Sequence, residues 1–428
     1  MTMKKLYPVL LAAVSAMSLT AAEVLTFAPK DAMPVYKCGE KAAFTLSVFD
    51  EGKAATSGKY TVVYTLDGNK ELSRQTVDLA QGNPATVSTT LDKPGFVLAR
   101  VLKADGKPAM TPAGKGKKAA ALAGAAFDPE KIKMGYDLPE DFMKFWEAGR
   151  KQIANQPVKL EKVEKYSKLN YNTYYVTVNT LNNETLTGYL SVPKGKGQYP
   201  VYITVPGAGA GIVGPALWAS KGVITLSMNV HKFPTADNAA EQKARYAENQ
   251  KIKPHYPVRG AGDRSKYFFY SVYVGIDRVI NHVAAMPEWD KKHMVIDGSS
   301  QGGGSALILS GFNKNITALA ANVPALCDHG GAKTGRSSGW PRLNNQKNAD
   351  AFAPYFDAAN FARFIKVPAL LSCGFIDTTC SPASVYAAYN QLKGTKQMIH
   401  VPLEGHTVSK IYVKSREAFV ARQLGLTR

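Results

Sequence analysis

The chain has 428 residues, of which 45% are hydrophobic, so it is long enough for about two or three domains with a large core. Its 53 lysines and arginines against 33 aspartates and glutamates give a net charge of +20. These basic residues are spread along the chain, which argues against a nucleic-acid-binding protein and favours solubility or attraction to acidic glycans. Four cysteines without a CxxC pair exclude a disulfide-framework miniprotein and a zinc ribbon.

Residues 1–22 have the pattern of a secretory signal peptide. Lys4 and Lys5 form a positive start, a mostly apolar stretch follows from Leu6 to Leu19, and Thr20 to Ala22 are small residues suited to cleavage. The apolar run is shorter than the roughly 20 residues that span a bilayer. We therefore expect an exported protein, periplasmic or extracellular, without membrane insertion.

An oxidising compartment permits disulfides. Cys373 and Cys380 are seven positions apart around an expected loop, a spacing that allows a disulfide without requiring one. Cys38 and Cys327 are expected to be single buried thiols.

Residues 23–106 have the pattern of a small immunoglobulin-like β-sandwich. Asp67 to Asn69 is a tight-turn signal, and no helical periodicity of useful length occurs in this region. Short strand-like runs recur at Ala42–Phe49, Tyr60–Leu66, Ala85–Leu91 and Phe96–Leu102. Residues 107–126 are rich in Lys, Gly, Ala and Pro, which predicts a linker between two domains.

Residues 127–428 alternate strands with helices, which predicts an α/β fold with a sheet covered on both faces. A helix is expected to open at Asp137 and run through Trp146, and others at Ser271–Met286, Gly303–Ser310 and Ser381–Leu392. Strands are expected at Tyr174–Val178, Thr187–Val192, Val201–Val205, Val223–Met228, Met294–Ile296, Ile316–Ala320, Ala369–Cys373 and Met398–Val401.

The strongest chemical signal is a G-x-S-x-G motif from Gly298 to Gly302, with Ser300 at its centre. A short apolar strand precedes it and a helix of small residues follows, which is the context of a nucleophile elbow. Glycines are needed on both sides because a Cβ there would collide with neighbouring backbone. A βα turn without chemistry is the alternative explanation of the pattern.

A serine hydroxyl needs a base to take its proton, and in this arrangement the acid and the base follow the serine along the chain. Three histidines follow Ser300. His329 comes too early, and His400 lies inside an apolar strand, where a structural role is expected. His406 lies in a loop beside Gly405, just before the last helix, and is the expected base.

The acid is expected after the preceding strand of the sheet. A buried strand from Val367 to Cys373 leads into a turn that ends at Asp377, which would orient the imidazole and stabilise its charged form. Asp328 is the alternative. Asp350 and Asp357 follow no strand, so we expect them on the surface or at helix caps.

An oxyanion hole needs two convergent N–H donors. One is expected from the amide after the nucleophile, that of Gln301. The other is expected from the loop after strand Val201–Val205, where Pro206 to Gly211 is rich in glycine, and Ala208 is our choice. A flexible loop without an oxyanion hole is the alternative.

From Leu138 to the C-terminus the chain resembles the acetyl xylan esterase and cephalosporin C deacetylase family, carbohydrate esterase family seven, within the α/β-hydrolase superfamily. The matching segments are Leu138–Phe142, Phe145–Trp146, Ser300–Gly304, Gly339–Pro341, Asp377, Cys380–Pro382, Ala387–Asn390 and Gly405–His406. The resemblance implies a triad of Ser300, Asp377 and His406 and oxyanion donors at Ala208 and Gln301, as chosen above.

The chain departs from the family at three places. Pro206 to Ala208 replaces the usual His-Gly-Tyr, and loss of the aromatic residue could widen the acyl pocket or leave another residue to fill it. The Arg-Gly-Gln-Gly stretch survives only loosely, as Arg259 to Gly262. The N-terminal β domain is additional, with glycan binding and simple packing both open as its role.

The predicted function is that of an exported serine esterase that removes acetyl groups from acetylated xylan or xylo-oligosaccharides, through an acetyl-serine and without metal or organic cofactor. The resemblance also implies activity on other acetylated small molecules. Members of the family often form closed homo-oligomers, whose interface the added N-terminal domain could block or alter. The alternatives are an exported serine peptidase, a glucuronoyl-type esterase, and a carbohydrate-binding protein with a decayed catalytic domain. The chain has no repeat array for a peptidase propeller, and Gln301 stands where a glucuronoyl esterase would be expected to have arginine.

Overall fold

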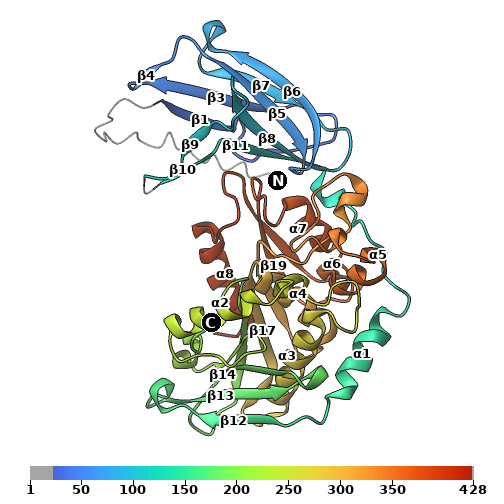
Figure 1. The fold of residues 1–428 in the computed structure, drawn as a ribbon. Coiled ribbons are helices and arrows are strands. Elements are labelled where there is room, and N and C mark those ends of the chain that lie inside the picture. The colour runs from blue at the N-terminus through green and yellow to red at the C-terminus, as the bar shows by residue number, and fades with distance from the viewer. Residues whose placement is uncertain (1–22, 115, 427–428) are drawn as a thin grey trace, which may run out of the picture. The chain divides into compact units, whose positions relative to one another are not determined.

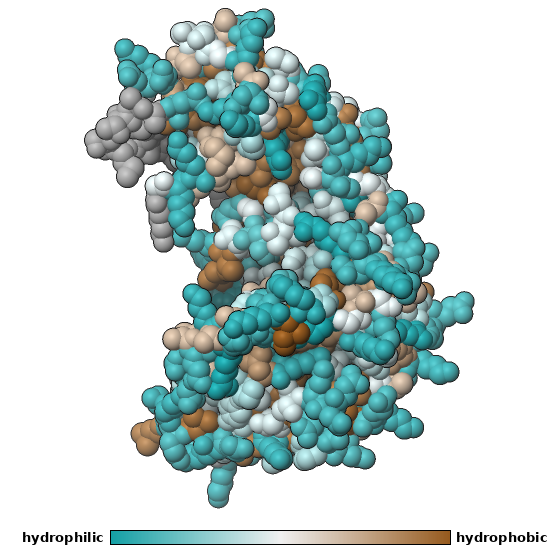
Figure 2. Space-filling view, viewed as in Figure 1, coloured by the Kyte–Doolittle hydropathy of each residue, from teal (hydrophilic) through white to brown (hydrophobic). Residues whose placement is uncertain are grey.

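The structure is a computed structural model that describes residues 23–114 and 116–426. The chain forms two compact units, Met1–Pro129 and Glu130–Arg428. The expected signal peptide, residues 1–22, lies outside the described residues. Within the described part, no helix has the length and apolar character needed to cross a membrane. The face in Figure 2 is largely hydrophilic, with apolar residues scattered in small groups.

The N-terminal unit is built from strands, drawn in blue and teal in Figure 1. One sheet pairs β3 (Ala42–Asp50) with β1 (Val24–Pro29), β4 (Lys53–Ala54) and β7 (Ala85–Thr89). The other has the order β2 (Val35–Tyr36), β11 (Leu122–Phe127), β8 (Gly95–Lys103), β5 (Lys59–Leu66) and β6 (Lys70–Asp78). Apolar side chains of both sheets form one core, which includes Phe44, Tyr64 and Val97. The N-terminal β-sandwich is therefore confirmed.

The segment expected as a linker, residues 107–126, forms strands instead, so that prediction was wrong. β9 (Met110–Pro112) pairs with β10 (Lys118–Ala120), and β11 pairs antiparallel with β8. The physical reason is that Ala123, Ala125 and Phe127 alternate along β11 and are fully buried in the core. Small alanine side chains in a lysine- and glycine-rich segment hid this alternation.

The C-terminal unit contains a nine-stranded sheet, which confirms the α/β-hydrolase prediction. Its order is β12 (Val158–Lys162), β13 (Tyr171–Asn179), β14 (Thr185–Pro193), β16 (Ile224–Met228), β15 (Tyr199–Val205), β17 (Trp289–Ser299), β18 (Ala318–Asn322), β19 (Ala369–Gly374) and β20 (Lys396–Val401). The strands from β16 onward are parallel, whereas β12, β13 and β14 pair antiparallel.

The α-helices are α1 (Phe142–Gln152), α2 (Ala239–Lys251), α3 (Phe268–Ala285), α4 (Gln301–Phe312), α5 (Ala349–Phe352), α6 (Ala358–Ala362), α7 (Pro382–Tyr389) and α8 (Lys410–Gln423). Helix α1 begins at Phe142 with Asp141 as its N-cap, so it starts later than the expected opening at Asp137. On one face of the sheet, α8 packs against residues such as Val295 and Leu370. Since side chains alternate along a strand, the other face of β17 is left for α3 and α4, which both contact this strand.

The parallel register brings the ends of five strands to one edge of the sheet. Val205 pairs with Gly298, Ser299 with Asn322, Asn322 with Ser372, and Gly374 with Val401. Loops that leave these strands therefore emerge side by side, although they are far apart in the sequence.

Candidate active site

Ser300 stands between the end of β17 and the start of α4, with a φ of 57° and a ψ of −121°. Non-glycine residues rarely adopt this conformation, so the surrounding turn must hold it. A Cβ on Gly298 would lie 2.3 Å from the carbonyl carbon of Gly302, and a Cβ on Gly302 would lie 2.2 Å from the oxygen of Val205. The sharp turn that exposes Ser300 therefore requires glycine at both flanking positions.

The structure brings Ser300, His406 and Asp377 together. His406 Nε2 lies 2.8 Å from Ser300 Oγ, and its Nδ1 lies 2.8 Å from Asp377 Oδ2. The Asp377 side chain is fully buried, and its Oδ1 accepts the backbone N–H groups of Thr379 and Cys380 at 2.8 and 2.9 Å. This arrangement can take a proton from the serine and hold the imidazole in one orientation.

Both predicted oxyanion donors lie on segments that flank Ser300. Gln301 is the first residue of α4, so its N–H has no acceptor within the helix. In the loop after β15, a Cβ on Gly207 would lie 3.9 Å from the Cβ of Ser300, and Ala208 follows directly. Each of the two expected donors therefore stands on a chain segment next to Ser300, as an oxyanion hole requires.

Two side chains that the sequence analysis missed support these segments. The Tyr256 hydroxyl donates to Gln301 Oε1 at 2.7 Å. His231 Nε2 lies 2.6 Å from the carbonyl oxygen of Gly209. Burial lowers the pKa of His231 to about 4, so its ring is neutral at pH 7 and donates Nε2–H to that carbonyl. Neither residue stands in a motif, and both contacts are between residues far apart in the chain.

The other candidate residues lie away from this relay. Asp328 pairs with Arg336 at 2.6 Å, His329 is fully buried, and His400 hydrogen-bonds to Tyr386. Asp357, expected on the surface or at a cap, does cap α6 but is completely buried.

The four cysteines are thiols, so Cys373 and Cys380 do not form a disulfide here. Burial, together with the nearby charge of Asp377, raises the pKa of the Cys380 thiol. Within residues 23–114 and 116–426, no group of His, Cys, Asp and Glu side chains is arranged to hold a metal ion.

Comparison with known proteins gives a family and a fold. Residues 130–424 match the family model described as acetyl xylan esterase (AXE1). The acetyl esterase Axe7A of Xylanibacter ruminicola is 30% identical over 393 residues, which cover 88% of this chain and 85% of that protein.

Two solved structures share the fold of the C-terminal unit. Acetyl xylan esterase 1 of a Thermoanaerobacterium species has a TM-score of 0.57 at 18% identity, covering 69% of this chain and 97% of its own. The acetyl xylan esterase of a Paenibacillus species has a TM-score of 0.56 at 24% identity, covering 69% and 98%. The chain is a carboxylic-ester hydrolase and belongs to the acetyl xylan esterase family.

Proposed function

We propose that the protein is an exported serine esterase that removes acetyl groups from acetylated xylan or xylo-oligosaccharides. The observation that carries the proposal is the continuous pair of 2.8 Å contacts from Ser300 through His406 to the buried carboxylate of Asp377. The family match and the acetyl esterase activity named for the Xylanibacter relative support the acetyl group as the substrate.

The reaction follows from the positions of these groups. Ser300 Oγ attacks the acetyl carbonyl carbon while His406 Nε2 takes its proton, and the amides of Ala208 and Gln301 stabilise the oxyanion. The carbon–oxygen bond to the sugar then breaks, and the sugar oxygen receives the proton from His406. Water, deprotonated by His406, attacks the acetyl-serine, and acetate leaves with Ser300 restored as a hydroxyl.

The side chain at position 208 gives the acyl site a distinct character. Ala208 is a small, exposed residue where the resembling family has tyrosine. We expect a wider space beside the acyl group and therefore tolerance of acyl groups somewhat larger than acetyl. No metal ion or organic cofactor has a step in this scheme.

We also propose that the chain is exported through the signal-like segment 1–22 and that copies associate. Three exposed apolar side chains lie close in sequence to His406, namely Leu403, Val408 and Ile411, at 64%, 54% and 61% exposure. Exposed apolar side chains of this kind can contact a substrate or a second copy. Light scattering of the purified protein measures the oligomeric state directly.

The decisive experiment is acetate release from acetylated xylo-oligosaccharides by the wild type and by Ser300→Ala. The wild type should release acetate, and the variant should lose at least about 10³-fold in kcat. Ser310→Ala, a serine at the far end of α4, is the matched control and should keep full activity. If the wild type releases no acetate, both proteins should be assayed on peptide and glucuronoyl-ester substrates, which test two of the alternative functions.

A further inference from the structure

The side chain of Asn322 joins two of the segments that carry the proposed triad. Asn322 is the last residue of β18 and is 2% exposed. Its Nδ2 donates to Ser299 Oγ at 2.8 Å and to the carbonyl oxygen of Thr407 at 3.1 Å. Ser299 directly precedes the proposed nucleophile, and Thr407 directly follows the proposed base.

The remaining polar atom of the same side chain reaches the third segment. Ser372 Oγ donates to Asn322 Oδ1 at 2.6 Å, and Ser372 lies on β19, the strand that leads to Asp377. The N–H of Val323 donates to Ser372 Oγ at 3.1 Å, which fixes the serine in turn. The two N–H groups and the oxygen of the Asn322 side-chain amide therefore each have a partner on a different segment. These three contacts set the orientation of the amide.

The backbone of Asn322 also supports the nucleophile turn. Its carbonyl oxygen accepts the N–H of Ser300 at 2.8 Å, and the carbonyl oxygen of Ser300 accepts the N–H of Ala325 at 2.9 Å. Because Ser300 has a φ of 57°, its conformation persists only if neighbouring groups hold it.

Side-chain packing is incomplete beside Asn322. A cavity of about 340 Å³ is lined by Asn322 and Ser299, by Gly207 from the loop after β15 and by Val408 from the loop that carries His406. Because interiors are otherwise close-packed, the hydrogen bonds of Asn322 add to what holds these segments beside the cavity.

We infer that Asn322 is a positioning residue for the esterase reaction: it sets the distance of His406 from Ser300 by binding both neighbouring residues and β19. The inference rests on the proposed triad. Asn322 itself takes no part in bond making, since its polar atoms are all used within the protein. Removing it should let the histidine loop shift relative to the serine, and a displacement of about 1 Å can cost about 10²-fold in rate.

The test compares Asn322→Ala with Asn313→Ala, using 4-nitrophenyl acetate as substrate. Asn313 is equally buried and donates to Asp277 and Asn281, but it precedes β18, at the opposite edge of the sheet. Asn322→Ala should lower kcat by about 10- to 100-fold with KM changed less than about twofold. Asn313→Ala should keep kcat, whatever its effect on the melting temperature.

Labelling by a fluorophosphonate separates this inference from the proposed function. The wild type should be labelled at Ser300, Ser300→Ala should not, and Asn322→Ala should be labelled more slowly in proportion to its kcat. An unlabelled, inactive wild type would refute the proposed triad. A labelled wild type together with a folded Asn322→Ala of normal kcat and labelling rate would overturn only the positioning role.

A second variant keeps the test decisive if Asn322→Ala does not fold. Asn322→Asp preserves the side-chain volume and the oxygen that accepts from Ser372. An ionised carboxylate has no N–H or O–H, so the hydrogen bonds donated to Ser299 and Thr407 are both lost. Its kcat should fall as well, and Ser372→Ala should cause a smaller fall because only one of the three contacts is lost. Normal kcat in Asn322→Asp would overturn the inference.

Discussion

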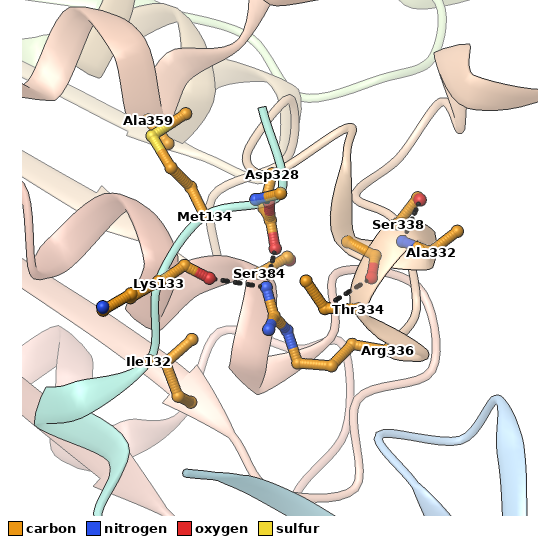
Figure 3. Close-up of polar contacts among 12 residues, drawn as sticks. Ile132, Lys133, Met134, Asp328, Ala332, Thr334, Arg336, Ser338, Ala359 and Ser384 are labelled. Carbon is orange, nitrogen blue, oxygen red and sulfur yellow. Dashed lines mark hydrogen bonds and ion pairs between the residues drawn. The ribbon is translucent and has the colours of Figure 1, made fainter. Parts of the chain in front are cut away.

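Two buried aspartates follow neighbouring strands at the same edge of the sheet, yet their surroundings differ. Asp377 follows β19 and contacts His406, whose ring also reaches Ser300. The His406 side chain is 27% exposed. Asp328 follows β18 and pairs with Arg336 at 2.6 Å (Figure 3). Its Oδ1 also accepts the N–H of Gly135 at 2.6 Å. Position at this edge therefore does not define the acid of a triad; its partner does.

The Asp328 region has the features of a structural cluster. Arg336 also donates to the carbonyl oxygen of Lys133 at 2.8 Å, which ties the start of the unit to the loop after β18 (Figure 3). Asp357 accepts the N–H groups of Asp328 and His329 at 2.8 and 2.7 Å. Burial, with the nearby charge of Asp328, raises the pKa of Asp357 to about 7. Asp328 and Asp357 are fully buried, and the contacts described here for their carboxylates are with groups of the protein itself, so they join loops to one another.

The difference between the two aspartates is tested most strongly by neutralising each one in turn. Asp377→Asn should lower kcat by about 10³- to 10⁴-fold, because His406 loses the carboxylate that orients it and stabilises its charge. Asp328→Asn should keep kcat within about threefold and lower the melting temperature instead. Ester hydrolysis and thermal denaturation of both variants measure the two effects. Equal losses of kcat would mean that the two regions are not separate.

Removal of Arg336 tests the structural role of the second region. Arg336→Met leaves the carboxylate of Asp328 buried without its cation, which should cost about 3–5 kcal/mol of unfolding free energy. Urea denaturation measures the loss, and the folded fraction should keep its kcat.

Lys333→Met is the matched control for this loss. It removes an exposed ion pair with Asp350, 2.9 Å long with side-chain exposures of 48% and 72%. Exposed pairs contribute little, so the change should stay within the error of the denaturation curve. A loss as large as that of Arg336→Met would show that burial does not set the strength of these pairs.

The stability supplied by the Asp328 region should depend on pH through His329. Burial lowers the pKa of His329 from 6.5 to about 4, so the folded protein keeps this ring neutral. The unfolded chain binds the proton near pH 6.5, so this stability is complete above that pH and is lost as pH falls towards 4, by about 3 kcal/mol. Urea denaturation of the wild type and of His329→Gln at several pH values isolates the effect.

The contribution of Asp357 has the opposite sign. Its raised pKa stabilises the folded state below about pH 4, and this stability is lost as pH rises through about 7. It is common to the wild type and His329→Gln, so it cancels in their difference. A constant difference in unfolding free energy between the two proteins from pH 7 to pH 4 would contradict the prediction for His329.

Local sequence was sufficient for the parts of the site that are contiguous in the chain. The strand, the G-x-S-x-G turn and the small-residue helix adjoin one another, so β17, Ser300 and α4 could be predicted together. Asp377 and His406 followed from the order of strands. Their roles remain predictions, whereas the distances between them are properties of the structure.

Long-range contacts between polar residues could not be predicted from the sequence. Asn322 stands 85 positions before Thr407, and Tyr256 stands 45 positions before Gln301. Asp357 was expected on the surface or at a helix cap because it follows no strand. It does cap α6, but its carboxylate is buried and accepts the N–H groups of Asp328 and His329. In each case the partner, not the local pattern, determines the environment of the side chain.

Strand β11 determines where the chain can be cut. A deletion that ends at residue 106 would leave Leu122–Phe127 attached to the esterase unit without β8, its antiparallel partner. An orphaned strand of this kind exposes unpaired backbone and the side chain of Phe127, which promotes edge-to-edge aggregation. Excision of the N-terminal unit should therefore end after Pro129, and insolubility of a shorter deletion would say nothing about glycan binding by that unit.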